Sequence, residues 1–567
     1  MGRICNFPTF VHLASPSSKM KIKVPLFPFS SASCWPAWFV CCALTLAAGA
    51  LQAQAPMDLS PVPAQVAPSP LPEGWQHGAF MEIFVRSWRD SDGDGIGDLK
   101  GLTQSLDHLQ KLGIRGLWLM PITRSADGDH GYATADYRSI EPAYGTLADF
   151  DELIREAHAR GIGVIMDYVV NHSADTHPAF VQSVREPQGP YRAWYEWRQE
   201  HPQGWDIWGR DPWIRTPAGS YLATFGAPMP DFNLRHPQVV AYHQDSLRFW
   251  LNRGLNGMRL DAVPHLIENN AKDWNDQPES RKLTGELTRL IKSYPGRYVV
   301  CEATAQPRAY ASPEVCGGSF AFGLESRIVP AAKGNVQAIQ DVAQYFVTAP
   351  HTLATFVSNH DQFAGQRLWD QVGGNEVQYK LAAATYLLLP GTPFIYYGED
   401  IGMAGAQGLS DDPKIRGPLS WSPDPNNGGF TTGQAYRALA SNLRSHHVQG
   451  QVQSAHSIWA FYKDLLALRN SRASIARGTY EFAQAQGQLM AYQRRMGREH
   501  SLVVINYDQQ AATLTLDGLT ADAELRPLYP AGGVQRLNAG QLTVPAQSVT
   551  SGSSALRCDK MSLACVA

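Results

Sequence analysis

Four apolar runs, far apart in the chain, each end in carboxylates or histidines. These polar ends comprise Asp167 with His172, Asp261 with His265, Glu302, and His360 with Asp361. Each run has the length and composition of a buried β-strand. In a β/α barrel the C-terminal ends of all strands meet at one rim, and functional groups gather there. This feature therefore predicts a barrel with a polar site above its strand ends.

From about residue 80 the chain alternates between strand-like and helix-like segments. Leucines repeat at helical spacing between residues 99 and 112. Thr146 and Asp149 have the spacing of a capping box for the next helix, and Gly161 can end it. Alternating βα units predict a parallel sheet. About eight of them predict an α/β fold of the (β/α)8 TIM-barrel class.

Two segments interrupt or follow this alternation. Residues 172–231 are rich in Pro, Gly and Trp without a clear period, which predicts a domain inserted after the third strand. Beyond residue 475, short alternating runs separated by turn residues predict an antiparallel β-sandwich. The expected order is a signal region at 1–55, a Pro-rich linker at 56–75, the barrel at 76–171, the inserted domain at 172–231, the rest of the barrel at 232–474, and a C-terminal β-domain at 475–567.

The N-terminus resembles a secretory signal. Lys21 and Lys23 precede an apolar run over residues 35–48, and small residues near Ala53 and Ala55 suit cleavage. Translation could start at Met20, and a membrane anchor is the alternative, although the run is short for a span. We therefore expect a secreted or periplasmic protein without stable membrane insertion.

Four cysteines follow the signal region: Cys301, Cys316, Cys558 and Cys565. In an oxidising compartment Cys301 could pair with Cys316, and Cys558 with Cys565. A reduced Cys301 buried in a strand is an equally good interpretation. None of the spacings resembles a zinc site.

Three carboxylates at the strand ends suggest a reaction. Asp261, Glu302 and Asp361 would converge over the mouth of one barrel, and a pair of close carboxylates suits double-displacement glycoside hydrolysis. Arg259 lies two residues before Asp261, so both side chains share one face of a strand. Its guanidinium is expected to lower the pKa of Asp261. The nearby histidines are expected to be neutral and to hydrogen-bond sugar hydroxyls.

Taken together, these segments resemble the conserved regions of the α-amylase family of glycoside hydrolases, over roughly residues 75–550. The resemblance implies a (β/α)8 barrel with Asp261 as nucleophile, Glu302 as general acid/base and Asp361 as the carboxylate that stabilises the transition state. It also implies seven substrate-binding or supporting residues: Tyr132, Asp167, His172, Arg259, His265, Asn359 and His360.

Alternating carboxylates and glycines between residues 90 and 98 suit a hard cation. Similar loops in the family bind structural Ca²⁺ through aspartates and one carbonyl. The resemblance therefore implies ligands from Asp90, Asp92, Asp94, Ile96 and Asp98. A solvated acidic turn is the alternative. The loop is not a full EF-hand, because residue 101 is Gly.

The segment 229–233 resembles members between the oligo-1,6-glucosidase and neopullulanase groups. Asp129 could close a pocket around a non-reducing end, but residues 412–418 lack the arginine that usually pairs with it. We therefore expect an α-amylase that cleaves α-1,4 bonds within starch and maltooligosaccharides. The alternatives are an α-glucosidase, a glucosyl-transferring enzyme such as trehalose synthase, and, remotely, a non-catalytic sugar-binding protein. Because the net charge is only −3, we expect no nucleic-acid partner. We also expect a monomer.

Overall fold

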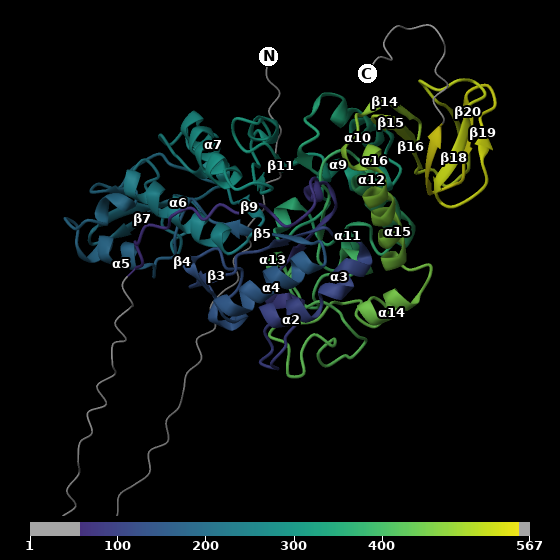
Figure 1. Cartoon of the computed structure of the whole chain (residues 1–567). Coiled ribbons are helices and arrows are strands. Elements are labelled where there is room, and N and C mark those ends of the chain that lie inside the picture. The colour runs from purple at the N-terminus through teal and green to yellow at the C-terminus, as the bar shows by residue number, and fades with distance from the viewer. Residues whose placement is uncertain (1–56, 555–567) are drawn as a thin grey trace, which may run out of the picture. The chain divides into compact units, whose positions relative to one another are not determined.

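A computed structural model describes residues 57–554 and contains the predicted barrel. Its eight parallel strands have the order β12-β11-β10-β9-β5-β2-β1-β13 (Figure 1). A parallel bridge between Thr355 and Pro393 joins the two ends of this order. The strands are β1 (Phe80–Ile83), β2 (Gly116–Leu119), β5 (Gly163–Tyr168), β9 (Gly257–Leu260), β10 (Tyr298–Cys301), β11 (Ser319–Phe320), β12 (Leu353–Ala354) and β13 (Phe394–Tyr396).

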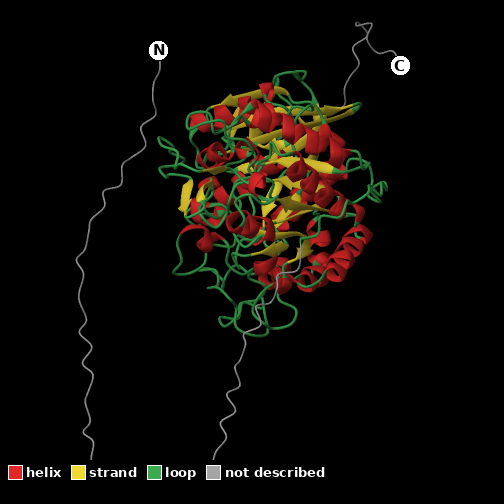
Figure 2. Cartoon of the chain, turned by 90° about the vertical axis from the view of Figure 1, so that its left-hand side faces the viewer, coloured by secondary structure: helices red, strands yellow, loops and turns green. Residues whose placement is uncertain are grey.

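Helices alternate with these strands and cover them (Figure 2). They are α1 (Val85–Trp88), α2 (Leu99–Gln104), α3 (Leu106–Leu112), α4 (Leu147–Ala159), α5 (Pro178–Arg185), α6 (Pro237–Asn252), α7 (Pro278–Lys292), α8 (Pro307–Tyr310), α9 (Glu325–Ala332), α10 (Val336–Thr348), α11 (Leu368–Gln371), α12 (Glu376–Leu388), α13 (Asp411–Ile415), α14 (Val448–Gln453), α15 (Ile458–Ser471) and α16 (Ala473–Arg477). None of the helices between residues 57 and 554 is both long and apolar enough to cross a membrane.

Local signals explain where the early helices begin and end. Thr146 and Asp149 form the predicted capping box of α4. The leucine repeat at 99–112 forms two helices, α2 and α3, instead of one. They meet at Ser105, whose hydroxyl donates to the carbonyls of Gly101 and Leu102. Such bonding from a serine to its own backbone competes with helix geometry.

Side chains of opposite strand faces form two cores. Phe80, Trp118, Ile165, Val300, Phe320, Ala354 and Phe394 fill the barrel interior from seven strands. The alternate residues, such as Met81, Leu117 and Val299, pack with the helices instead. Because successive strand residues face opposite sides, both faces of the parallel sheet are apolar, as a barrel requires.

The segment between β5 and α6 interrupts the alternation of barrel strands and helices. It holds α5 and a three-stranded antiparallel sheet of β6 (Trp197–Arg198), β8 (Gly219–Leu222) and β7 (Trp213–Thr216). A separate antiparallel hairpin, β3 (Thr123–Ser125) and β4 (Thr134–Ile140), follows β2. Aromatic contacts such as Phe180 with Tyr195 and Trp197 consolidate the inserted unit. The dense aromatic composition of this segment therefore has a packing role.

The C-terminal strands are antiparallel and form two sheets (yellow in Figure 1). The bounds are β14 (Glu481–Gln486), β15 (Leu489–Met496), β16 (Glu499–Asn506), β17 (Ala512–Thr515), β18 (Glu524–Tyr529), β19 (Gln535–Arg536), β20 (Gln541–Val544) and β21 (Ser548–Ser554). The larger sheet has the order β14-β15-β16-β21-β18-β19, and β17 pairs with β20. A shared apolar cluster that includes Leu502, Leu514 and Leu542 joins the two sheets.

The structure covers only some of the segments for which predictions were made at the two ends of the chain. Residues 57–72, within the predicted Pro-rich linker, form no helix or strand but hydrogen-bond to α6, for example from the amide of Val62 to Asp245 at 3.1 Å. The predicted signal region at 1–55 and the predicted Cys558–Cys565 pair lie outside the described residues.

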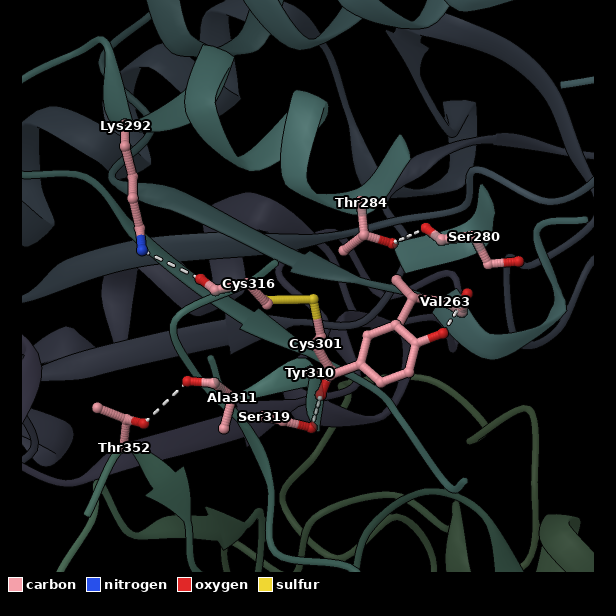
Figure 3. The surroundings of a disulfide bond; sticks show 10 residues. All are labelled: Val263, Ser280, Thr284, Lys292, Cys301, Tyr310, Ala311, Cys316, Ser319 and Thr352. Carbon is pink, nitrogen blue, oxygen red and sulfur yellow. Dashed lines mark hydrogen bonds between the residues drawn. A yellow bond between two sulfur atoms is a disulfide. The ribbon is translucent and has the colours of Figure 1, made fainter. Parts of the chain in front are cut away.

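The Cys301–Cys316 disulfide is present (Figure 3). In the sequence, Cys301 directly precedes Glu302. Cys301 is the last residue of β10, and Cys316 belongs to the loop that leads to β11. Both cysteines are fully buried. The bond therefore ties the end of β10 to the following loop.

Candidate active site

The barrel brings the polar strand ends together. Asp167 lies within β5, Asp261 directly follows β9, and Glu302 directly follows β10. Asp361 follows β12 by seven residues, because β12 is shorter than the predicted strand at 353–357. Asp261, Glu302 and Asp361 all line one cavity of about 820 Å³. The sequence prediction that these three carboxylates converge is therefore met in the structure.

Arg259 is the centre of the carboxylate group. Its Nη1 donates to Asp167 Oδ1 at 2.7 Å and also to Asp261, while its Nη2 lies 2.9 Å from Glu302 Oε2. Only 1% of its side chain is exposed. Burial opposes its charge, but the surrounding carboxylates outweigh this effect and raise the pKa of Arg259. A buried guanidinium can hold several carboxylates at once through its planar fork.

The pKa of Asp261 differs from the sequence prediction. Arg259 does favour the ionised form, but burial and the charges of Glu302 and Asp167 raise the pKa of Asp261 above its usual value. Three carboxylates share one guanidinium, so the group has excess negative charge in a desolvated place.

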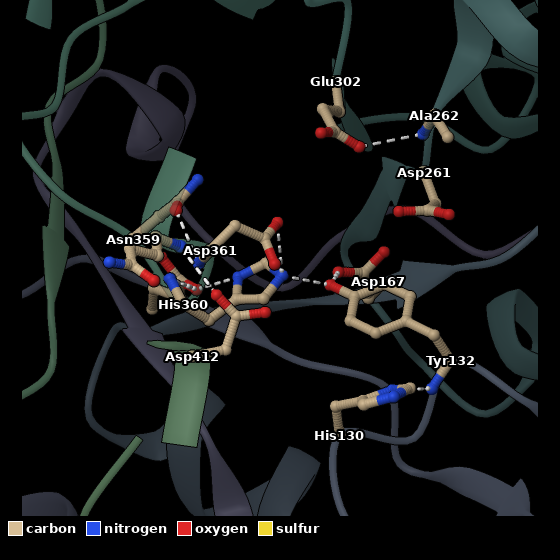
Figure 4. A network of polar contacts seen from close by, with 12 residues as sticks. His130, Tyr132, Asp167, Asp261, Ala262, Glu302, Asn359, His360, Asp361 and Asp412 are labelled. Carbon is tan, nitrogen blue, oxygen red and sulfur yellow. Dashed lines mark hydrogen bonds and ion pairs between the residues drawn. The ribbon is translucent and has the colours of Figure 1, made fainter. Parts of the chain in front are cut away.

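A strained backbone residue links two of the carboxylates. Ala262 has φ 44°, in the left-handed region that non-glycine residues rarely adopt. Its amide donates to Glu302 Oε2 at 3.0 Å (Figure 4). Strain of this kind is stored mainly at functional sites. Ala262 thereby orients Glu302 relative to the neighbouring Asp261.

A second group is centred on His360 (Figure 4). Its Nδ1 donates to Glu82 Oε1 at 2.6 Å, and its Nε2 lies 3.1 Å from Asp361 Oδ2 and 2.7 Å from the hydroxyl of Tyr132. That hydroxyl in turn donates to Asp167 Oδ2 at 2.8 Å. Tyr132 therefore connects the His360 group to the Arg259 group.

The charge of His360 contradicts the expectation of a neutral imidazole. Burial opposes its protonation, but Asp361 and Glu82 outweigh burial and raise the pKa of His360 to about 10. Conversely, burial would raise the pKa of Asp361, but His360 and Arg416 lower it below its usual value. Asp361 therefore stays ionised beside a permanent imidazolium at neutral pH.

The other predicted substrate residues have different places. His172 and His265 line the cavity. Burial lowers their pKa values to about 3 and about 4, so both are neutral as predicted. Asn359 does not line the cavity. Its Oδ1 accepts from the amide of Asp361 at 2.8 Å and shapes the turn that carries this carboxylate.

The structure adds Glu82 and Arg437 to the predicted residues. Glu82 is a buried carboxylate in the otherwise apolar strand β1, and this break in the pattern was a usable sequence signal. Arg437 Nη2 lies 2.7 Å from Asp129 Oδ1, so the partner missing from residues 412–418 comes from a later loop. Arg416, within 412–418, instead contacts Asp361 and Asp412 at 3.0 Å and 2.9 Å.

The predicted cation loop gathers some of its expected ligands. Oxygens of Asp90, Asp92 and Asp98 all lie within 4.8 Å of one another. Asp94 is not in this group, and its Oδ1 accepts from the amide of Ile96 at 2.8 Å. Burial opposes the charge of Asp90, but the hydroxyl of Thr431 and loop amides outweigh it and lower the pKa of Asp90. The oxygen donors fit a hard cation such as Ca²⁺.

Another oxygen-rich group lies beside the site. Asp231 is buried and accepts from Asn171 Nδ2 at 3.1 Å, and burial raises its pKa to about 7. Burial and the charge of Asp231 also raise the pKa of Glu268. Its Oε1 is buried without a hydrogen-bond partner among residues 57–554.

Comparisons with known proteins agree with this geometry. Residues 82–478 match the family model for the α-amylase catalytic domain. The chain is 35% identical over 456 residues to alpha-amylase 3 of Dictyoglomus thermophilum, covering 77% of this chain and 86% of that protein. It is 32% identical over 490 residues to the trehalose synthase/amylase TreS of Mycolicibacterium smegmatis, covering 76% and 82%.

A solved structure supports the same assignment. The alpha-glucosyl transfer enzyme XgtA superposes with a TM-score of 0.75 at 26% identity, covering 85% of this chain and 99% of that chain. The family model spans most of the chain, and the relatives with assigned activities are glycosidases or glucosyl-transferring enzymes. The chain therefore belongs to the α-amylase family of glycoside hydrolases.

Proposed function

We propose that this protein is a retaining α-amylase that hydrolyses α-1,4-glucosidic bonds in starch and maltooligosaccharides. The observation that carries the proposal is the shared contact of Asp261 and Glu302 with the buried Arg259. Both carboxylates line the cavity. Double displacement needs one ionised carboxylate and one carboxylic acid on the same bond. Two carboxylates that share one buried guanidinium and line the same cavity can meet this need.

We assign each proposed step to one of these groups. Asp261 attacks the anomeric carbon while Glu302 gives its proton to the departing glycosidic oxygen. Glu302 then takes a proton from water, which attacks the sugar carbon bonded to Asp261 and releases the product in its original configuration. The ionised Asp361 would stabilise the positive charge that develops on the sugar. His172 and His265 would bind sugar hydroxyls without adding charge.

The stereochemistry of the product tests this reaction. We expect α-anomeric maltooligosaccharides to appear first when soluble starch is digested, as followed by proton NMR before mutarotation. Initial release of β-anomers would contradict the retaining mechanism. Failure to cleave any α-glucan would contradict the proposed hydrolysis and leave the non-catalytic sugar-binding function as the better explanation.

A second candidate function is an α-glucosidase or a glucosyl-transferring enzyme such as trehalose synthase. The ion pair of Asp129 with Arg437 favours it, because Asp129 adjoins His130 at the cavity wall and could close the space behind a terminal sugar. The similarity to TreS is consistent with this alternative. Incubation with maltose alone separates the candidates. Rapid formation of glucose or trehalose favours the second, and slow turnover compared with starch favours the α-amylase.

We also propose structural Ca²⁺ at Asp90, Asp92 and Asp98, with Asp94 and the carbonyl of Ile96 completing the loop once the ion binds. The grouping of three carboxylates supports this proposal. Secretion or export to the periplasm is proposed from the signal-like N-terminus, and the Cys301–Cys316 disulfide is consistent with an oxidising compartment. We further propose that the enzyme acts as a monomer.

A further inference from the structure

Two exposed aromatic side chains border the cavity. The exposed fractions are 53% for Trp208 and 66% for Phe363. Both line the same cavity as Asp261 and Glu302. Among the large hydrophobic residues exposed between residues 57 and 554, the one other aromatic is Phe482 of β14, which does not line this cavity. Two aromatic rings at one cavity offer apolar surface that a ligand can cover.

Trp208 is held in position by other rings. Its ring makes edge contacts with His265 at 5.1 Å and Trp274 at 5.7 Å between centroids, and a tilted contact with Phe225 at 5.6 Å. His265 in turn stacks on Trp274. The backbone of Trp208 has φ 52°, a conformation that bulky residues adopt only under strain. The fold therefore holds a large apolar ring in a defined orientation at the edge of the cavity.

Phe363 lies two residues after Asp361, and its ring packs on another aromatic ring. Its ring stacks on that of Phe322 at 6.0 Å, and Phe322 packs on the buried Phe356. Phe322 also lines the cavity. Both exposed rings therefore rest on aromatic supports and need little ordering when a ligand binds, which lowers the entropy cost of binding.

The strand order shows which end of a substrate these rings would meet. Glu302 follows β10, which lies opposite β1 in the closed eight-strand order. Trp208 contacts His265, which follows β9, and Phe363 follows β12. Both rings therefore lie on the side of the barrel that contains β10. The Asp129–Arg437 pair comes from the loops after β2 and β13, which flank β1.

This arrangement gives the bound substrate a direction. The general acid must lie beside the oxygen of the departing sugar, so the departing part of the chain lies on the Glu302 side. Trp208 and Phe363 flank that side, whereas the ion pair lies opposite. The apolar face of a sugar ring can cover an aromatic ring and remove both from water.

We propose that Trp208 and Phe363 form the binding site for the departing part of an α-glucan, and for the acceptor sugar in any glucosyl transfer. The inference rests on the proposed function for the direction of the chain. It assigns chain-length preference to these two rings, which take no part in the bond cleavage itself.

A binding experiment tests the site without requiring activity. In a Glu302→Gln background, isothermal titration calorimetry measures maltopentaose affinity with Trp208→Ala or Phe363→Ala added. We expect each change to weaken binding by about tenfold, in the range for a central aromatic contact. Trp208→Phe should retain most of the affinity. Phe482→Ala is the matched control and should bind normally. Unchanged affinity in both alanine variants would overturn the proposal.

A kinetic experiment separates this inference from the proposed reaction. In the otherwise native enzyme, Trp208→Ala and Phe363→Ala should lower kcat/KM for maltopentaose by about tenfold. Hydrolysis of α-glucosyl fluoride should change less than about twofold, because fluoride is too small to reach the two rings. Equal losses on both substrates would overturn the inference. A native enzyme that cleaves neither substrate would contradict the proposed function instead, and the calorimetry would still decide whether the rings bind glucan.

Discussion

The Arg259 group and the rim of the cavity are built in different ways. Arg259, Asp167 and Asp261 belong to strands or directly follow them, and their side chains are almost fully buried. Trp208 and Arg437 belong to loops, and Phe363 belongs to a short 3-10 helix, η5 (Gln362–Ala364). Trp208 and Phe363 are more than half exposed. The difference suggests that strand ends determine the reaction while loops determine which carbohydrate is accepted.

The largest effect is expected when the proton donor Glu302 is removed from the carboxylates at the strand ends. Glu302→Gln keeps the shape and removes the acid, so starch hydrolysis should fall by about 10²–10⁴-fold, the usual contribution of general acid–base catalysis. Reducing-sugar release measures the change. Glu152→Gln, on the exposed part of α4, is the control and should be fully active. Near-normal activity of Glu302→Gln would show that another group supplies the proton.

The next effect concerns the pH dependence of the His360 group. The folded protein holds the His360 proton up to about pH 10, whereas an ordinary imidazole releases it near 6.5. This interaction therefore stabilises the fold fully below about pH 6.5, and its contribution is lost as the pH rises towards 10. Glu82→Gln removes one anionic partner of the imidazolium and should lower the pKa of His360.

Activity profiles and ring NMR can measure that change. In Glu82→Gln the alkaline loss of activity should move down by about one pH unit or more, as expected for loss of a close opposite charge. The His360 ring signals should titrate at the same lower pH. A structural defect alone would reduce activity at all pH values without moving the profile. An unmoved His360 titration would refute the role of Glu82.

Some residues of the candidate site could be predicted from the sequence, and others could not. Residues next to the strand ends were identifiable, because buried strands have a clear apolar pattern and a barrel brings their ends together. Arg437 could not be identified, because 308 residues separate it from Asp129. The pKa directions of Asp261 and His360 also needed the structure, since they depend on how many carboxylates surround each charge. Domain boundaries, Ca²⁺ and export stay predictions.

A smaller effect is expected when the Asp129–Arg437 ion pair, on the side of the barrel opposite Glu302, is removed. Arg437→Ala removes the partner of Asp129, and a partly exposed ion pair contributes up to about 1 kcal/mol, or roughly fivefold. We expect cleavage of a maltoheptaoside with a blocked non-reducing end to rise several-fold relative to the unblocked one. Arg444→Ala, an exposed arginine in the same loop, should leave this ratio unchanged. An unchanged ratio in Arg437→Ala would mean that the ion pair does not limit chain position.

The smallest expected effect concerns the aspartate loop. A chelator should lower the melting temperature by a few degrees, because an ion that binds only the folded state stabilises it. Asp92→Asn should reduce that shift, since Asp92 belongs to the loop and not to the group around Asp231. Differential scanning fluorimetry with and without added Ca²⁺ measures both. A chelator effect that Asp92→Asn leaves intact would place the ion elsewhere.

In the proposed reaction, Asp261 forms the covalent bond to the sugar. Incubation with 5-fluoro-α-glucosyl fluoride should trap this bond, because the second fluorine slows its hydrolysis more than its formation. Intact-mass measurement followed by peptide mapping locates the label. We expect one 5-fluoroglucosyl group per chain on the peptide containing Asp261, and none in Asp261→Asn. A label on another residue, or an unlabelled enzyme that still turns over starch, would contradict the account.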